Sequence, residues 1–183
     1  PESLRLRWGL RRSTGETCWA RKAPARPHAL GLGWKELKNQ LKSFTPPEGR
    51  CNIRRVNDIT IIDDTYNANL ESTLSSIHYL KAISKSGRKI FVFGDMYELG
   101  ASTNEQHKQV GDKCSDLDLV YTLGIHSKIT SKAIRNNIPK KHFSSKEELI
   151  ISLKKTIKAG DKILFKGSRG MAMEKVIKGT FQI

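Results

Sequence analysis

Carboxylate and amide side chains follow directly after an apolar, β-branched run. Residues 59–62 (Ile-Thr-Ile-Ile) lead into residues 63–69, which read Asp-Asp-Thr-Tyr-Asn-Ala-Asn. The run is typical of a strand buried on both faces, as in a parallel sheet. Apolar residues at positions 74, 77, 80 and 83 then predict a helix over about 70–84, with Asn69 as its N-cap. Open α/β sheets bind ligands at such strand-to-helix turns, so we interpret the cluster as half of a nucleotide or substrate site.

Three further polar turns follow predicted strands: Gly-Asp-Met at 94–96, Leu-Gly-Ile-His at 123–126 and Lys-Gly-Ser-Arg at 166–169. If the strands are parallel, these turns share one edge of the sheet with residues 63–69. Helix amino ends and cationic side chains at that edge favour anions, so the set suits a phosphorylated, hydroxylated ligand. For Gly124 and Asp95 taken singly, an ordinary strand-to-helix turn is an equally good explanation.

Short apolar runs alternate with helical periods along the chain and would position these turns. Residues 51–56 and 59–63, separated by Asn57-Asp58, predict a hairpin whose first strand is an antiparallel edge. The other predicted elements are strands at 89–94, 117–123, near 142–143 and at 162–166, and helices at about 103–115, 126–136, 146–158 and 171–178. The pattern predicts an α/β fold, a Rossmann-like, doubly wound, mostly parallel sheet of about six strands with flanking helices.

Two of the predicted helices begin with a recognisable cap. Ser102 with Glu105, and Ser145 with Glu148, match the S-x-x-E pattern of the capping box. We therefore expect each serine to accept a hydrogen bond from the backbone three residues later.

Composition and charge narrow the class of protein. A chain of 183 residues accommodates one ordinary domain and an appendage, and no apolar run approaches the length of a membrane span. Three scattered cysteines indicate neither a disulfide framework nor a zinc site, which favours a reducing compartment such as the cytosol. The net charge of +15 is spread over predicted helix surfaces, and only 7% of the residues are aromatic. We expect a cytoplasmic monomer that binds neither membrane nor nucleic acid.

The amino-terminal part differs from the rest. Residues 1–28 carry seven Lys or Arg and two Glu, a net charge of +5, without helical or strand period. We expect this segment to be disordered or artefactual. Residues 29–48 are predicted to form a connecting helix and a linker, and residues 49–183 the ordered domain.

Several sequence signatures are absent. The chain has no G-x-x-x-x-G-K-[ST] phosphate loop, no complete dinucleotide fingerprint and no G-x-S-x-G nucleophile turn. Its five histidines fall singly, without a second metal ligand three or four residues away, so a surface or hydrogen-bonded structural role is expected for each. Any nucleotide chemistry at the polar turns is therefore incomplete within this sequence.

A series of motifs, in order and spacing, resembles the carboxyl-terminal domain of the Mur ligase family over about residues 29–177. They are Ala-Leu-Gly at 29–31, Pro-Pro-Glu-Gly-Arg at 46–50, Ile-Asp-Asp-Thr-Tyr-Asn-Ala-Asn at 62–69, Gly-Asp-Met-Tyr-Glu-Leu-Gly at 94–100 with His107, and Lys-Gly-Ser-Arg at 166–169 with Met173-Glu174. Each is weak alone, but the third and fourth together are specific. Leu70 and Tyr97 stand where the family usually has proline and often leucine, and neither departure alters a site side chain.

The resemblance implies an ATP-dependent ligase that joins a peptide carboxylate to an amine through an acyl phosphate. It is closest to members that add D-alanyl-D-alanine to UDP-N-acetylmuramoyl-tripeptide in peptidoglycan synthesis. ATP with Mg²⁺ and these two peptides would then be its ligands, with Mg²⁺ held mainly by a central domain that carries the phosphate loop. We expect the chain by itself to bind ATP weakly and not to turn over.

The resemblance also assigns roles to particular residues. Arg50 would contact nucleotide phosphate, and Asp64 would contact the ribose or hold that arginine; these two are the predicted catalytic residues. The predicted cofactor contacts beside adenine and ribose are Tyr66, Asn67 and Asn69. The predicted contacts to the incoming dipeptide or to phosphate are Lys166, Ser168 and Arg169. No metal ligand is predicted in this domain, and a turn cap is the simpler expectation for Asp63.

Two alternatives stay open at this point. One is a folylpolyglutamate synthetase-like ligase domain, which the Tyr-Asn-Ala-Asn and Gly-Asp-Met motifs disfavour. The other is a basic, non-enzymatic module that keeps the fold and binds nucleic acid. The placement of polar residues at strand ends, instead of on a basic aromatic face, argues against the second.

Overall fold

The computed structural model describes residues 39, 46–84 and 86–183. The chain divides into two units, Pro1–Thr45 and Pro46–Ile183, and the sheet with its helices belongs to the second. The expected character of residues 1–28 and nearly all of the predicted connecting helix lie outside the described residues, so they stay predictions.

Six strands form one sheet in the order β1-β2-β6-β3-β4-β5. Their bounds are β1 Asn52–Val56, β2 Ile59–Asp64, β3 Lys89–Gly94, β4 Leu119–Leu123, β5 Lys140–Phe143 and β6 Lys162–Lys166. Strands β1 and β2 pair antiparallel, whereas the other neighbours pair parallel. Asn57 and Asp58 both have positive φ, 47° and 64°, as the tight turn between two twisted strands requires. The predicted hairpin and the predicted sheet are thus confirmed.

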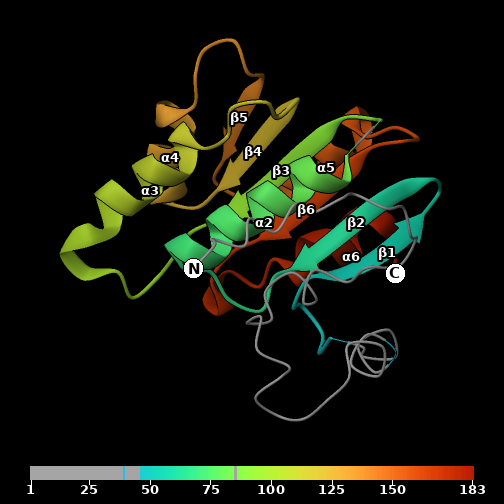
Figure 1. The fold of residues 1–183 in the computed structure, drawn as a ribbon, viewed down its shortest axis with the longest axis horizontal. Helices are drawn as coiled ribbons and strands as arrows, with labels where there is room; N and C mark the ends of the chain where they lie inside the picture. Colours follow the sequence, from blue (N-terminus) through green and yellow to red (C-terminus); the bar gives the residue numbers. More distant parts are fainter. Residues whose placement is uncertain (1–38, 40–45, 85) are drawn as a thin grey trace, which may run out of the picture. The chain divides into compact units, whose positions relative to one another are not determined.

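Five helices connect the parallel strands and follow the last one: α2 Leu70–Ile83, α3 Thr103–Asp112, α4 Ser127–Ala133, α5 Lys146–Thr156 and α6 Glu174–Phe181. The crossovers through α2, α3 and α4 run in one direction across the sheet, and the crossover through α5 runs back from β5 to β6. Because such crossovers are right-handed, α2, α3 and α4 lie on one face and α5 with α6 on the other. Figure 1 shows α2 in front of β6 and β3, with α6 behind β2.

Alternating strand residues fill both faces of the sheet. On one face, Ile61, Val92 and Phe165 join a core cluster with Leu149 of α5 and Val176 of α6. The alternate positions point to the helices of the other face, and four of them are fully buried: Ile62, Phe91, Phe93 and Leu164. Because side chains alternate along a strand, Asp64 and Lys166 continue this second face at the carboxyl ends of β2 and β6.

The helix caps confirm part of the sequence prediction. Asn69 accepts a hydrogen bond from Ser72 N–H, and the Ser72 hydroxyl accepts one from Asn69 N–H, so the N-cap of α2 is confirmed. Ser145 caps α5 by accepting from Glu148 N–H at 3.2 Å. The prediction for Ser102 was wrong. A 3-10 turn, η3 Gly100–Ser102, precedes α3, and the Ser102 hydroxyl donates to the Leu99 carbonyl instead.

Candidate functional site

Strands β2, β6 and β3 end side by side at the carboxyl edge of the sheet, where Asp64 and Phe93 both lie opposite Lys166. The chain after β6 passes to one face, whereas the chains after β2 and β3 pass to the other. This divergence is the topological switch point at which open α/β sheets bind ligands. The predicted clustering of residues 63–69, 94–96 and 166–169 is therefore what the sheet order produces.

A buried ion pair lies at this point. Lys166 is 1% exposed, and its Nζ lies 2.7 Å from Asp64 Oδ2. The same ammonium group donates to the Asn67 carbonyl at 3.0 Å, and the Ser76 hydroxyl from α2 lies 2.6 Å from Asp64 Oδ2. We call Asp64, Lys166, Ser76 and the Asn67 carbonyl the ion-pair network. In this structure the cationic partner of Asp64 is Lys166, and the predicted contact of Asp64 with the ribose or with Arg50 stays a prediction.

Most backbone N–H and C=O groups of the loop 65–69 have hydrogen-bond partners. Tyr66 N–H donates to the Gly49 carbonyl at 2.9 Å, and Ala68 N–H donates to Asn67 Oδ1 at 2.8 Å. Thr65 is bonded to Asp63 Oδ1 through both its N–H and its hydroxyl. Asp63 therefore caps a turn, as expected. The anchored backbone leaves the side chains of Tyr66 and Asn67 exposed.

Two guanidinium groups converge on Tyr66. The Arg50 Cζ atom lies 4.0 Å from the centre of the Tyr66 ring, and the Arg169 Cζ atom lies 5.9 Å from it. Tyr66 is 44% exposed, so the cluster is open to solvent. Cation–π attraction holds both guanidinium groups near one ring while leaving their N–H donors available. Such a pair is suited to bind phosphate oxygens with planar, two-pronged contacts.

Ser168 connects three loops through hydrogen bonds. It is 3% exposed, and its hydroxyl accepts from Tyr97 N–H at 2.8 Å and lies 3.4 Å from the Ala68 carbonyl. Its own N–H donates to the Asp95 carbonyl at 2.9 Å. Ser168 and Lys166 were predicted as ligand contacts, but both side chains are buried among internal partners. Of the three residues predicted to contact the dipeptide or phosphate, only Arg169 is exposed, and the ligand contacts of all three stay predictions.

Asp95 fixes the turn after β4. Its two carboxylate oxygens accept from Ile125 N–H at 2.8 Å and Ser127 N–H at 2.7 Å, which positions the start of α4. A Cβ atom at Gly124 would lie 2.5 Å from that carboxylate, and Gly124 has φ of +121°. Asp95 and Gly124 thus form a structural turn, the simpler of the two explanations considered for each.

His107 lies beneath the same turn and is completely buried. Its Nε2 accepts from Met96 N–H at 3.2 Å, and its Nδ1 lies 3.0 Å from the Thr130 hydroxyl, which itself donates to the His107 carbonyl. These bonds fit the neutral ring with the proton on Nδ1. Burial lowers the pKa of His107. We call Asp95, Met96, His107 and Thr130 the histidine network.

Sequence reasoning missed the parts that Ser76 and His107 take. A surface or hydrogen-bonded structural role was expected for His107; the hydrogen bonds confirm the second, whereas its complete burial, which follows from the packing of α3 against α4, was not expected. Ser76 had a detectable signal, because it lies next to Ile77 and one turn before Leu80 on the apolar face of α2. A polar residue on such a face indicates a buried partner.

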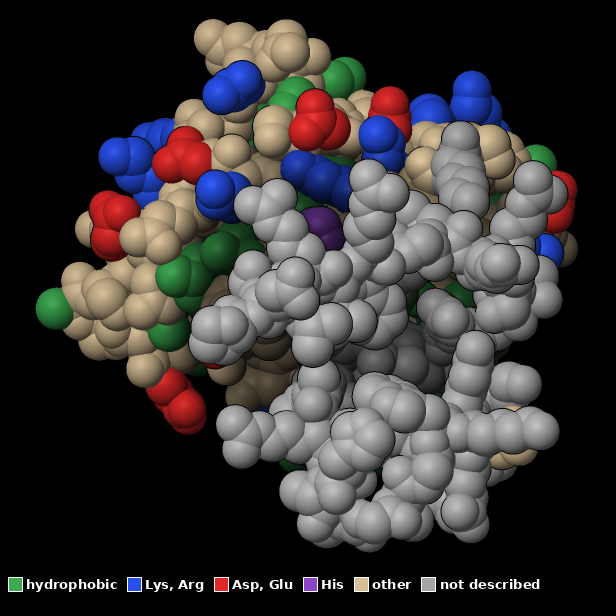
Figure 2. Space-filling model, in the orientation of Figure 1, with side chains coloured by type: hydrophobic (Ala, Val, Ile, Leu, Met, Phe, Trp, Pro, Cys, Tyr) green, Lys and Arg blue, Asp and Glu red, His purple; other side chains and the backbone are tan. Residues whose placement is uncertain are grey.

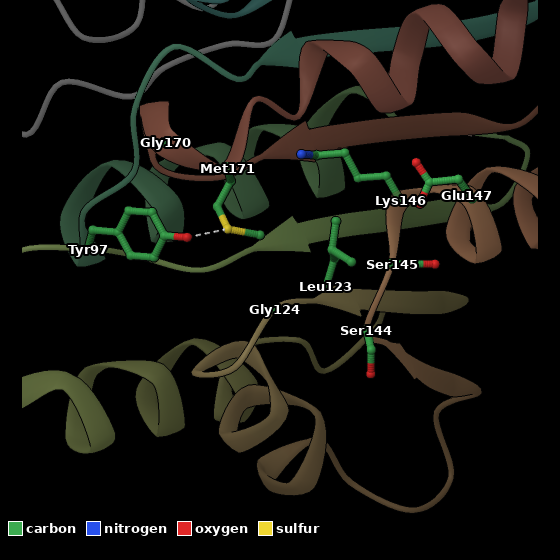
Figure 3. Close-up of a pocket in the computed structure, with 9 residues that line it drawn as sticks. All are labelled: Tyr97, Leu123, Gly124, Ser144, Ser145, Lys146, Glu147, Gly170 and Met171. Atoms are coloured by element: carbon green, nitrogen blue, oxygen red, sulfur yellow. Dashed lines mark hydrogen bonds between the residues drawn. The ribbon is translucent and has the colours of Figure 1, made fainter.

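A pocket of about 400 Å³ lies beside the turn after β6, η4 Arg169–Met171, which contributes Gly170 and Met171 to its lining. Figure 3 shows the Lys146 side chain extending toward Met171, and the Tyr97 hydroxyl directed at the Met171 sulfur at 2.8 Å. Burial raises the pKa of Tyr97, and the charge of Asp95 adds to the effect, so the phenol stays protonated and donates. The lining comprises Tyr97, Leu123, Gly124, Ser144, Ser145, Lys146, Glu147, Gly170 and Met171.

Charge on the described surface is mixed. Figure 2 shows lysine and arginine side chains interspersed with acidic ones on the face drawn, without a continuous basic patch. Among the described residues, no group of three or more His, Cys, Asp or Glu side chains is placed to hold a metal ion. No helix in the described ranges has the length and apolar character needed to cross a bilayer.

The fold and the site define an α/β domain with two guanidinium groups beside an exposed tyrosine at its switch point. A family model described as "Mur ligase, glutamate ligase domain" matches residues 49–169. The chain therefore belongs to the Mur ligase family. The folylpolyglutamate synthetase-like and nucleic-acid-binding alternatives are not favoured.

Two curated relatives of this chain have the same name. The chain is 33% identical over 135 residues to the UDP-N-acetylmuramoyl-tripeptide-D-alanyl-D-alanine ligase of Bacillus subtilis, covering 71% of this chain and 30% of the relative. It is 34% identical over 161 residues to the ligase of the same name from Synechocystis, covering 85% and 35%. The chain thus spans about a third of the length of these relatives.

Solved structures agree with the family assignment. A MurF ligase from Thermotoga maritima in complex with ADP superposes with a TM-score of 0.72 at 30% identity, covering 85% of this chain and 35% of that one. A MurF from Acinetobacter baumannii gives a TM-score of 0.73 at 27% identity, with the same coverage.

Proposed function

We propose that this domain is the carboxyl-terminal part of a cytoplasmic ligase that uses ATP to add D-alanyl-D-alanine to UDP-N-acetylmuramoyl-tripeptide. The observation that carries the proposal is the convergence of Arg50 and Arg169 on Tyr66 at the switch point, in a chain of this family. The names of the relatives supply the two peptide substrates. The ADP complex of the Thermotoga maritima ligase supports a nucleotide ligand.

The reaction passes through an acyl phosphate. The terminal phosphoryl group of ATP moves to the tripeptide carboxylate, and the amine of the dipeptide then attacks the acyl carbon and expels phosphate. Negative charge on the phosphoryl group must be neutralised throughout. Arg50 is half-buried and Arg169 is exposed, and both guanidinium groups lie against the exposed Tyr66 ring, so we assign their two positive charges to nucleotide or acyl phosphate.

The neighbouring residues would define where the nucleotide lies. Tyr66 holds both guanidinium groups and, with Asn67, offers exposed polar groups beside the ribose and base. The Asn69 amide oxygen is occupied as the cap of α2, so we assign it to positioning of that helix start. Asp64 would contribute by orientation, through its contact with Lys166.

The pocket beside η4 is our proposed site for the dipeptide. A dipeptide is a zwitterion with one carboxylate and one ammonium group. Lys146 and Glu147 offer opposite charges at the pocket, and Ser144 adds a hydroxyl. Arg169 of η4 contacts Tyr66, and the next two residues, Gly170 and Met171, line the pocket, so a dipeptide bound there would lie close to the guanidinium pair.

Magnesium would neutralise part of the phosphate charge when bound. The described residues do not group into a cluster that fits a metal ion, so we assign its protein ligands to other parts of the ligase. The contribution of this chain is then its two arginines and the loops that position them.

Steady-state kinetics test the proposal. The domain is joined to the amino-terminal two thirds of a relative such as the Bacillus subtilis ligase. Arg50→Ala is expected to lower kcat about 100-fold, corresponding to roughly 3 kcal/mol of lost transition-state stabilisation. Arg50→Lys should recover little, because a point charge does not reproduce a planar contact. Asp64→Ala is also expected to lower kcat, by loss of orientation.

The matched control is Asp63→Ala, which removes the neighbouring carboxylate that caps a turn. It is expected to lower stability and leave kcat near the starting value. Lys146→Met should raise KM for the dipeptide without raising KM for ATP. Unchanged kcat in both the Arg50 and the Asp64 variants would overturn the mechanistic assignment.

The 183-residue chain alone gives a second test. It contains no phosphate loop, so we expect weak ATP binding and no ligase turnover. Stoichiometric ATP hydrolysis by the pure chain, abolished by substitution of Lys166, would show that the active site has been misplaced.

A further inference from the structure

A fully buried lysine contacts the loop that carries the exposed site residues. Lys166 Nζ lies 2.7 Å from Asp64 Oδ2 and donates to the Asn67 carbonyl at 3.0 Å. Desolvating a lysine is strongly unfavourable, and an apolar pair of similar volume at the ends of β2 and β6 would often be as stable. An apolar side chain, however, has no donor for the Asn67 carbonyl.

Asn67, which carries that carbonyl, and its neighbour Tyr66 are both exposed residues of the loop 65–69. Tyr66 N–H is held by Gly49, and the Ala68 carbonyl lies near the Ser168 hydroxyl at a longer 3.4 Å. The contact from Lys166 is the charged one among these anchors, and hydrogen bonds from ionised donors are about twice as strong as neutral ones. The conformation of the segment 66–68 therefore depends on the lysine more than on its other anchors.

We propose that Lys166 is a positioning residue, whose buried ammonium group joins Asp64 to the Asn67 carbonyl and holds the loop 65–69 in the conformation that presents Tyr66 and Asn67 to the nucleotide. The proposal rests on the proposed function for its nucleotide. Lys166 acts through the loop and makes no contact with a substrate. Ser76 orients Asp64 from α2, so the helix that follows the loop is joined to the same ammonium group.

Amide hydrogen exchange on the 183-residue chain tests the positioning role. Lys166→Met is expected to reduce protection of the Tyr66 and Ala68 amides at least tenfold relative to amides of α3. Lys162→Met is the matched control, because Lys162 lies at the opposite end of the same strand and donates to the Ser86 carbonyl. It should leave the loop protected.

The double variant Asp64→Asn with Lys166→Met separates positioning from stability. It leaves no buried charge unpaired, so global stability should recover, whereas the Asn67 carbonyl still lacks its donor and the loop should stay open. If Lys166→Met does not fold, the same exchange measurement can be made on the double variant. Wild-type protection of the loop in the double variant, or equal opening in Lys162→Met, would overturn the proposal.

An ADP titration followed by amide chemical shifts distinguishes the proposed nucleotide binding from the proposed positioning role of Lys166. In the wild-type chain, millimolar ADP should shift the Tyr66 and Asn67 amides, and in the double variant these shifts should be lost. If the wild-type amides do not move, the proposed nucleotide role fails, whereas the exchange result still decides whether Lys166 positions the loop.

Discussion

Two buried polar networks hold the loops at the carboxyl edge of the sheet, and they are built from different chemistry. The ion-pair network joins β2, β6 and α2 through a lysine and a carboxylate. The histidine network joins β3, α3 and α4 through a neutral imidazole and a carboxylate whose partners are backbone amides. The first lies under the exposed side chains of the loop 65–69, whereas the second lies under the turn after β4.

Because of this difference, the two networks should respond differently to the loss of one side-chain partner. In the histidine network the charged Asp95 is bonded to backbone amides, and His107 is bonded to the Met96 amide and the neutral Thr130 hydroxyl, so loss of Thr130 or of the ring leaves a dipole unsatisfied. In the ion-pair network, loss of Lys166 or Asp64 leaves a charge unsatisfied, which is far more unfavourable in a buried position. The network held by two oppositely charged side chains is therefore the more fragile support, and it lies beside the residues we assign to phosphate.

The largest effect is expected in the ion-pair network. Lys166→Met leaves Asp64 buried with Ser76 but without its cation, and should lower the free energy of unfolding by about 3–5 kcal/mol. Urea denaturation of the 183-residue chain measures this value. A loss below about 1 kcal/mol would mean that solvent reaches Asp64 and that the two networks do not differ as argued.

The sequence predicted the framework of both networks but not their partners. Alternation of apolar runs and helical periods was sufficient for the sheet, and it brought residues 63–69 and 166–169 to one edge. The contact between Lys166 and Asp64 joins residues 102 positions apart, and nothing in either motif indicates which cation faces which carboxylate. Resemblance to the family offered the ribose or Arg50 as the partner of Asp64, whereas strand alternation places Lys166 on the same face of the sheet as Asp64.

Three other features near the site could not be predicted from the sequence, because each depends on a local structural detail. The S-x-x-E pattern at Ser102 lacks the extended backbone of a cap, because η3 runs directly into α3. The burial of His107 depends on how α3 packs against α4, which no single helix period reveals. The guanidinium pair at Tyr66 required the turn before β1 and the turn after β6 to meet.

A glycine substitution tests the histidine network. Gly124→Ala places a methyl group 2.5 Å from the Asp95 carboxylate at a backbone φ of +121°, so both a clash and strain oppose folding. We expect a loss of about 3 kcal/mol in the free energy of unfolding. Gly100→Ala is the matched control, with φ of +54° and open space around it, and should lose only about 1 kcal/mol.

Equal losses in the two glycine variants would show that Asp95 moves aside without penalty. In that case the carboxylate would not be a rigid part of the turn after β4. Denaturation in urea followed by fluorescence measures both variants under the same conditions.

A smaller effect is expected from Ser76, the neutral member of the ion-pair network. Ser76→Ala removes a hydroxyl 2.6 Å from Asp64 and should lower the free energy of unfolding by about 1.5 kcal/mol, since hydrogen bonds to charged groups exceed neutral ones. Ser75→Ala, one position earlier on α2, should be neutral or slightly stabilising because alanine favours helix. Equal effects at the two positions would exclude Ser76 from the network.

The smallest effect concerns pH and the histidine network. Burial lowers the pKa of His107, opposed by the Met96 backbone and Asp95 and aided by His126, so the folded state keeps the ring neutral. The unfolded chain takes up a proton near its ordinary pKa of about 6.5. The unfolded state therefore binds more protons below that pH, and the stability contributed by neutral His107 is full above it and lost as pH falls through the lowered folded pKa.

His142 acts in the same direction, because burial and Lys128 lower its pKa against the effect of Asp95. The variant His107→Gln isolates the contribution of His107 to this pH dependence. Between about pH 7 and pH 5 its unfolding free energy should fall by roughly 1 kcal/mol less than that of the wild type. His78→Gln, on the exposed side of α2, is the control and should leave the slope as in the wild type. An identical slope in the His107 variant would mean that the ring gains its proton in the folded state as easily as in the unfolded chain. The His107 ring would then be charged at low pH, and the contrast between a neutral ring and an ion pair would hold only near neutrality.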